Sequence, residues 1–252
     1  MASRDGKPGN GGPPLNEIAE GFAAALRLIA GLDAELVAIV GLSLKVSLSA
    51  VFFAALVALP AGAALAVFRF PGRRAVVVLI NALMGLPPVV VGLVVYLLLS
   101  RSGPLGLLGW LFTPPAMIAA QTVLVAPLIA AIARQSIAEL WSEYADELRS
   151  LGAGPFRSIF TLLWDGRFQL TTALLAGFGR ASAEVGAVIL VGGNIAHVTR
   201  VMTTAIALET SKGDLALALG LGIILLAISL AVNAAAYVIN EVARVRAAEN
   251  AA

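Results

Sequence analysis

The sequence predicts an all-α membrane protein with five transmembrane helices, an N-terminus outside the cytoplasm and a C-terminus inside it. Of the 252 residues, 60% are hydrophobic and only 13% are charged, whereas soluble domains are about 45–50% apolar and about 25% charged. The mean hydropathy is +0.94. Five apolar segments also reach the roughly 20 residues that a helix needs to cross a bilayer. This composition places the chain in the membrane class.

Two segments precede the first apolar segment. Residues 1–15 are polar and rich in Gly and Pro, so we expect a disordered tail. Residues 16–35 place Ile18, Phe22 and Ile29 on one helical face, away from the charged residues. This pattern predicts an amphipathic helix lying on the membrane surface. The alternative is that residues 16–35 simply extend the first span.

The expected transmembrane domain covers residues 36–240, and residues 241–252 form a cytoplasmic tail. Each predicted span is a long apolar segment bounded by polar or turn-forming residues. The five spans are Leu36–Phe68, Ala75–Leu99, Thr113–Ala133, Leu170–Val191 and Leu215–Ile239.

The second span contains Gly85-Leu86-Pro87-Pro88 near its middle. Two consecutive prolines remove two backbone donors and break a helix. Such breaks are tolerated at membrane depth only where protein or a water-filled path covers them. Pro87 and Pro88 are therefore expected to lie against other protein or beside a water-filled path.

The distribution of Lys and Arg sets the orientation. Five spans divide the polar segments between two sides, which receive nine and six basic residues, while Lys45 and Arg180 fall within spans. The short loop after the first span, R-F-P-G-R-R, has three arginines. The positive-inside rule places that loop, the segment after the third span and the C-terminus in the cytoplasm.

The longest polar interruption is the segment 139–168, between the third and fourth spans. Residues 131–151 can continue the third span as a helix, which Gly152 can end. Pro155 suits the first position of a second helix, expected over Phe156–Leu163. The segment therefore predicts two helices joined by a glycine turn that project into the cytoplasm.

This loop resembles the coupling loop of permease subunits of binding-protein-dependent ABC importers. Their loop has an E-A-A-x-x-x-G core followed at a fixed distance by L-P. The segment D-E-L-R-S-L-G-A fits the core, whereas Trp164-Asp165 stands at the L-P position. The resemblance implies docking to a separate ATPase, and the alternative is an ordinary solvated hairpin. The implied docking residues are Asp146, Glu147, Arg149, Leu151, Gly152 and Ala153.

A second pattern lies in and after the fourth span. It reads R-A-S-A-E-V-G-A from Arg180 to Ala187, then G-G-N ending at Asn194, then a threonine-containing segment. It is similar to permeases of the tungstate and molybdate type. The resemblance covers roughly residues 36–240 and implies import of an oxyanion, most closely tungstate, with molybdate or another small anion as the alternative. It further implies an external binding protein, a partner ATPase that uses the ATP, and a homodimer in the cytoplasmic membrane of a bacterium or archaeon.

Arg180 and Glu184 are four residues apart, which would place them on one helical face. A charge within a span usually faces a bundle interior or a pore. The two side chains can form a simple structural pair. Alternatively, Arg180 can attract an anion while Glu184 holds the Arg180 side chain in place. Together with Pro87, Pro88 and Asn194 they are the candidate residues of the translocation path.

Other functions have less support in the sequence. The chain has no cysteine and one histidine, and it lacks a G-x-x-x-x-G-K-[ST] loop, so we expect no metal site, no bound cofactor and no catalysis. A net charge of +2 does not suggest nucleic-acid binding. A secondary transporter predicts repeated halves, and an intramembrane enzyme needs a nucleophile and base within spans; neither pattern is found.

Overall fold

The computed structural model describes residues 34–249 and, before them, Ala19, Phe22, Ala23, Leu26 and Gly31, with side chains described up to residue 242. The predicted tail at 1–15 lies outside the described residues. So does most of the predicted surface helix, of which Ala19, Phe22, Ala23 and Leu26 are helical. Its position on a membrane remains a prediction.

The described part of the chain contains helices and no strand, which confirms the all-α class. The elements begin with α2 (Ala34–Val67), α3 (Arg73–Leu83), α4 (Pro88–Leu99) and the 3₁₀ turn η1 (Gly106–Leu108). They continue with α5 (Pro114–Ser150), α6 (Pro155–Asp165), α7 (Arg167–Ser182) and α8 (Gly186–Gly192). The last two are α9 (Met202–Lys212) and α10 (Leu215–Glu249).

Three helices are long and apolar enough to cross a membrane alone: α2, α5 and α10. The second and fourth predicted spans are each divided into a bent helix pair, α3 with α4 and α7 with α8, so the count is three to five. The prediction of a break in the second span is confirmed. The prediction of one continuous helix over Leu170–Val191 is wrong, because the chain leaves the helix at Ala183–Val185.

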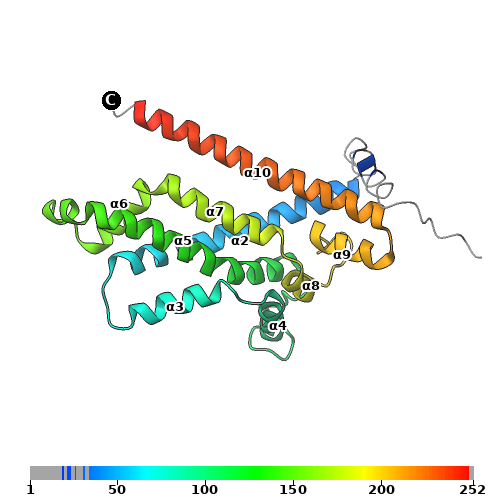
Figure 1. Cartoon of the computed structure of the whole chain (residues 1–252). Helices are drawn as coiled ribbons and strands as arrows, with labels where there is room; N and C mark the ends of the chain where they lie inside the picture. The colour runs from blue at the N-terminus through cyan, green and yellow to red at the C-terminus, as the bar shows by residue number, and fades with distance from the viewer. Residues whose placement is uncertain (1–18, 20–21, 24–25, 27–30, 32–33, 250–252) are drawn as a thin grey trace, which may run out of the picture.

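The helices α2 and α5 pack against each other along much of their length, and Figure 1 shows them running side by side. Small residues allow the close approach. A Cβ atom on Gly62 of α2 would lie 2.6 Å from the Ala130 carbonyl oxygen and 2.9 Å from the Arg134 amide nitrogen of α5. The two backbones therefore touch at this point, with no room for a side chain.

Three apolar clusters follow one another along α5. Ala116, Met117 and Ala120 belong to the first, which also includes parts of α4 and α8. Val125, Ile129 and Ala130 belong to the second, with α2 and α7, and Ala133 and Ile137 belong to the third, with α2 and α6. One continuous helix thus contributes to all three of these clusters.

The loop after α2 is fixed by an arginine. The Arg73 Nε donates a 2.6 Å hydrogen bond to the carbonyl oxygen of Leu65 in the last turn of α2. Cations are favourable near the negative end of a helix dipole. This loop brings α3 back alongside α5, although α3 has no buried residue in the isolated chain.

Replacing Gly62 with leucine is expected to destabilise the bundle by about 1–3 kcal/mol, because the new side chain would force the backbones of α2 and α5 apart. Thermal unfolding of the purified chain in detergent measures the loss. Gly41→Leu is the matched control on the same helix, since a Cβ atom there meets no atom within 4 Å. Equal destabilisation by both variants would contradict the close-packing explanation.

Candidate coupling and translocation sites

The end of α5 is closed by a Schellman turn. The Ala153 amide donates to the Leu148 carbonyl at 2.9 Å, and the Gly152 amide donates to the Arg149 carbonyl at 2.9 Å. Gly152 has φ +73°, the left-handed conformation that favours glycine. Pro155 then begins α6 at its first turn, where a missing amide proton costs nothing. The predicted pair of helices with a glycine turn is confirmed, and α6 extends to Asp165.

The predicted docking residues lie at the end of the molecule formed by the α5–α6 junction (Figure 1). Asp146, Glu147, Arg149, Leu151 and Gly152 are exposed, and Ala153 is half-buried. Arg149 pairs with Asp146 at 3.0 Å, but such exposed pairs contribute little to stability. Leu151 is 80% exposed, so its apolar side chain is accessible to a docking partner.

Helix α6 has two different faces. Ile159 and Leu162 are buried against α2 and α5, which anchors the helix to the bundle. Phe156, Phe160 and Trp164 follow each other at four-residue spacing and are 69–73% exposed. The sequence reasoning assigned no role to this aromatic face. The i, i+4, i+8 spacing of its three residues was the signal that could have identified it.

The first helix break separates α3 from α4 by an angle of 100°. Pro87 adopts an extended conformation with φ −64° and ψ 122°, and Pro88 is the first residue of α4. The residue before a proline is pushed out of the helical region. Pro87 is therefore held extended by Pro88, and this local restriction directs α4 away from the axis of α3.

The second break separates α7 from α8 by 60°. Arg180 is an exposed residue in the last turn of α7, and Glu184 lies beyond the end of that helix. The expectation that the two side chains share one helical face is therefore wrong. They form no ion pair with each other, among the residues that the structure describes.

Glu184 instead stabilises the break. Glu184 is only 6% exposed, and its Oε1 accepts a 3.1 Å hydrogen bond from the Ala187 amide in the first turn of α8. The Thr203 hydroxyl donates at 2.9 Å to the Glu184 carbonyl oxygen. A helix break exposes backbone groups that need partners at membrane depth. Here, a side chain from the break and one from α9 supply them.

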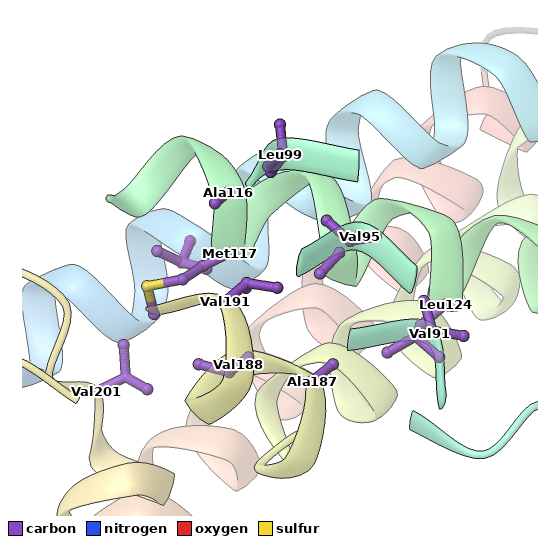
Figure 2. Close-up of a cluster of buried hydrophobic side chains, with 12 residues drawn as sticks. Val91, Val95, Leu99, Ala116, Met117, Leu124, Ala187, Val188, Val191 and Val201 are labelled. Carbon is purple, nitrogen blue, oxygen red and sulfur yellow. The ribbon is translucent and has the colours of Figure 1, made fainter. Parts of the chain in front are cut away.

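The two short helices that follow the breaks pack on each other. Gly92 of α4 faces Ala187 of α8 so closely that a Cβ atom on Gly92 would lie 2.7 Å from the Ala187 Cα. Figure 2 shows the surrounding cluster, to which Val91 and Val95 of α4 and Val188 and Val191 of α8 belong. Residues of α5 complete this cluster. The contact is apolar and close, and it joins two helices that each follow a sharp bend.

The loop between α8 and α9 is organised by a buried threonine. The Thr199 hydroxyl donates to the Gly192 carbonyl at 2.5 Å and accepts from the Ile195 amide at 2.9 Å. Asn194 has φ +51°, and its Nδ2 donates to the Thr204 carbonyl at 3.4 Å. Asn194 thus lies in the connection between α8 and α9, whereas Arg180 and Glu184 lie at the other end of α8. Thr199 was not singled out from the sequence.

Comparisons of the sequence with known proteins show the family of the chain. Residues 58–245 match the family described as "Binding-protein-dependent transport system inner membrane component". The tungstate uptake system permease protein TupB of Peptoclostridium acidaminophilum is 42% identical over 227 residues, which cover 90% of this chain and 100% of that protein. A probable anion ABC transporter permease protein of Haloferax volcanii is 42% identical over 204 residues, or 79% of this chain and 88% of that protein.

A third relative is the tungstate uptake system permease protein TupB of Campylobacter jejuni. It is 34% identical over 219 residues, which cover 87% of this chain and 92% of that protein. The family match covers more than half of the chain, and each of these relatives is aligned over most of its length. The chain therefore belongs to the inner membrane components of binding-protein-dependent transport systems, as a non-catalytic, multi-pass permease of the cytoplasmic membrane.

Proposed function

We propose that this chain is the membrane-spanning subunit of an ABC importer that moves an oxyanion, tungstate in particular, into the cell. The observation that carries the proposal is the 42% identity to a tungstate uptake permease over that protein's whole length. An external binding protein delivers the anion, and a separate ATPase supplies the energy. Molybdate is the second candidate, since the two oxyanions have the same charge and nearly the same size.

The geometry supports a mechanical route from the ATPase to the membrane. The ATPase docks on Asp146, Glu147, Arg149, Leu151, Gly152 and Ala153 at the end of α5. Helix α5 has 37 residues and so spans about 55 Å at 1.5 Å per residue. Its other end packs into the cluster in which α4 meets α8. A displacement at the docking end can therefore reach both broken helices through one rigid element.

The pore itself lies between two copies of the chain, which span the membrane five times each with the N-terminus outside. The paired breaks at Pro87-Pro88 and at Glu184 form its gate. Many apolar side chains of α3, α4 and α10 are exposed in the isolated chain, among them Leu79, Leu93 and Leu230, so lipid or a second copy must cover them. Arg180 is exposed at the second break and supplies a positive charge for the anion.

Vesicles containing this chain, its ATPase and its binding protein are expected to take up tungstate when ATP is supplied. Unlabelled tungstate should compete better than molybdate, and sulfate should compete least, as measured by accumulation of the labelled anion. Uptake without the ATPase is the control. Absence of ATP-dependent uptake of all three anions would refute the oxyanion proposal, whereas preference for molybdate would reassign only the substrate.

Replacing Gly152 with leucine is expected to lower the amount of anion transported per ATP hydrolysed. A side chain at φ +73° costs roughly 1–2 kcal/mol and opens the turn that presents the docking residues. Gly154→Leu is the matched control, because both glycines have open space around their Cβ position but Gly154 has φ −70°. Normal coupling in Gly152→Leu would argue against docking at this turn.

Arg180→Ala is expected to reduce uptake at least tenfold while the complex still assembles with its ATPase. The side chain is exposed and makes no ion pair in the described chain, so the bundle does not depend on it. Arg180→Lys retains the charge and should preserve a measurable share of transport. A parallel loss of assembly and uptake, measured by co-purification and by the vesicle assay, would assign Arg180 a packing role instead.

A further inference from the structure

An open groove runs between α2, α6 and α7, separate from the docking turn and from the contact between α4 and α8. Its volume is about 440 Å³, within the roughly 300–1,000 Å³ that is usual for small-ligand pockets. Its apolar walls include Phe52 and Leu56 of α2, Phe160 of α6 and Leu174 of α7. Phe52, Leu56 and Phe160 are 62%, 64% and 73% exposed, so no other part of the described chain covers these walls.

Arg167 is the only charged residue among the described residues that line the groove. Its Nη1 donates a 2.7 Å hydrogen bond to the Trp164 carbonyl oxygen. Its guanidinium carbon lies 4.9 Å from the centre of the Trp164 ring and 4.4 Å from that of the Phe168 ring. Nε and Nη2 make no hydrogen bond within the described chain, neither is buried, and no carboxylate pairs with the side chain there. Arg167 is thus a cation held in place with donors to spare.

Arg167 also lies where a membrane boundary is expected, since it is the first residue of the bent helix pair α7 and α8, a candidate span. Leu170 shares an apolar cluster with Ala66 near the end of α2, whereas Phe178 shares one with Val51 in the middle of α2. The helices α2 and α7 are therefore antiparallel. The groove consequently extends from Arg167 toward the middle of the α2 span.

The length of the groove fits one leaflet of a bilayer. On α2 it is lined from Pro60 to Phe52, eight residues that rise about 12 Å at 1.5 Å per residue. The hydrocarbon core of a bilayer is about 30 Å thick, so one leaflet contributes about 15 Å. Trp164, beside Arg167, is 69% exposed, and tryptophan is enriched at the interface between membrane and water. The groove therefore has the length and the apolar lining for an acyl chain.

We propose that this groove binds an anionic phospholipid, with one acyl chain along α2 and α7 and the phosphate of the head group on Arg167. The Nε and Nη2 of a guanidinium can donate to two phosphate oxygens at once. Basic pockets between transmembrane helices bind anionic head groups. A lipid in this groove contacts α6 together with α2 and α7, and so fastens the helix that follows the docking turn to the membrane-spanning part. The proposal does not depend on which anion is transported.

Other occupants fit the groove less well. A two-fold contact between copies places the same surface on both sides. Here it would join two surfaces that each carry an unpaired arginine, and the only acids of α2, α6 and α7 are Glu35 and Asp165, neither of which lines the groove. Like charges across an interface are unfavourable. A soluble partner such as the ATPase cannot reach Phe52, which lies within the α2 span.

Retention of lipid by the full-length chain tests the proposal. The chain is purified in detergent with equal amounts of phosphatidylglycerol and phosphatidylcholine of the same acyl chains, and native mass spectrometry counts the bound molecules. Phosphatidylglycerol should be retained preferentially, and Arg167→Ala should lower its retention about tenfold, which corresponds to about 1.4 kcal/mol. Arg157→Ala is the matched control, because this exposed arginine of α6 neither lines the groove nor makes an ion pair in the described chain. Equal retention by both variants, or of both lipids by the unmodified chain, would overturn the proposal.

A second variant tests the acyl chain and leaves Arg167 in place. Ala55→Trp fills the groove and should lower phosphatidylglycerol retention to about the level of Arg167→Ala, whereas Val57→Trp should not, since Val57 is 66% exposed on the same helix and does not line the groove. Unchanged retention in Ala55→Trp would refute the placement of the chain. The protein has no cysteine, so Leu56→Cys introduces a single thiol. Efficient disulfide formation between two such copies in membranes would identify a second copy as the occupant and overturn the proposal.

Discussion

The continuous packing of α5 against α2 is the constraint on which the rest of the structure depends. At Gly62 the two backbones are in contact, so neither helix can shift without the other. Side chains of α5 enter the apolar cluster beside α4 and α8, the middle of the bundle, and the cluster that anchors α6. Protein interiors transmit displacement because they are densely packed. A rigid α5 therefore connects the docking turn to helices that are themselves broken.

Proline alone does not explain which helices are broken. Pro60 lies within α2 and Pro127 within α5, and both helices remain continuous. One proline removes one donor, and neighbouring helices can satisfy the freed carbonyl at membrane depth. At Pro87-Pro88 the second ring also forces the first residue to be extended, which no packing can reverse without strain. In the second span, local backbone chemistry thus decides between a continuous helix and a broken one.

The helix break in the fourth span, between α7 and α8, could not be predicted in the same way. The segment from Arg180 to Ala187 contains no proline, and its residues read as part of an apolar helix. The break is held within the segment by the Ala187 amide bond to the Glu184 side chain, and from outside it by the Thr203 bond to the Glu184 carbonyl and the Gln121 bond to the Ala181 carbonyl. By contrast, Gly152 and Pro155 act locally, and the turn between α5 and α6 was predictable from them. The turn at Gly152–Pro155, which a few residues encode, was predicted, whereas the break at Ala183–Val185, which depends in part on distant partners, was not.

The polar side chains within the bundle are required by this second helix break. Leaving the helix at Ala183 frees backbone groups that water would satisfy in a soluble protein, whereas here Glu184, Thr203 and Gln121 must do so. Gln121 gives an amide proton to the Ala181 carbonyl, and its own side-chain oxygen is left buried without a partner among the described residues. The buried polar side chains on one side of this break and the apolar contact of α8 with α4 on its other side are then two consequences of one bend. Any movement of α8 during transport must keep both intact or exchange them together, which favours two discrete arrangements over a gradual change.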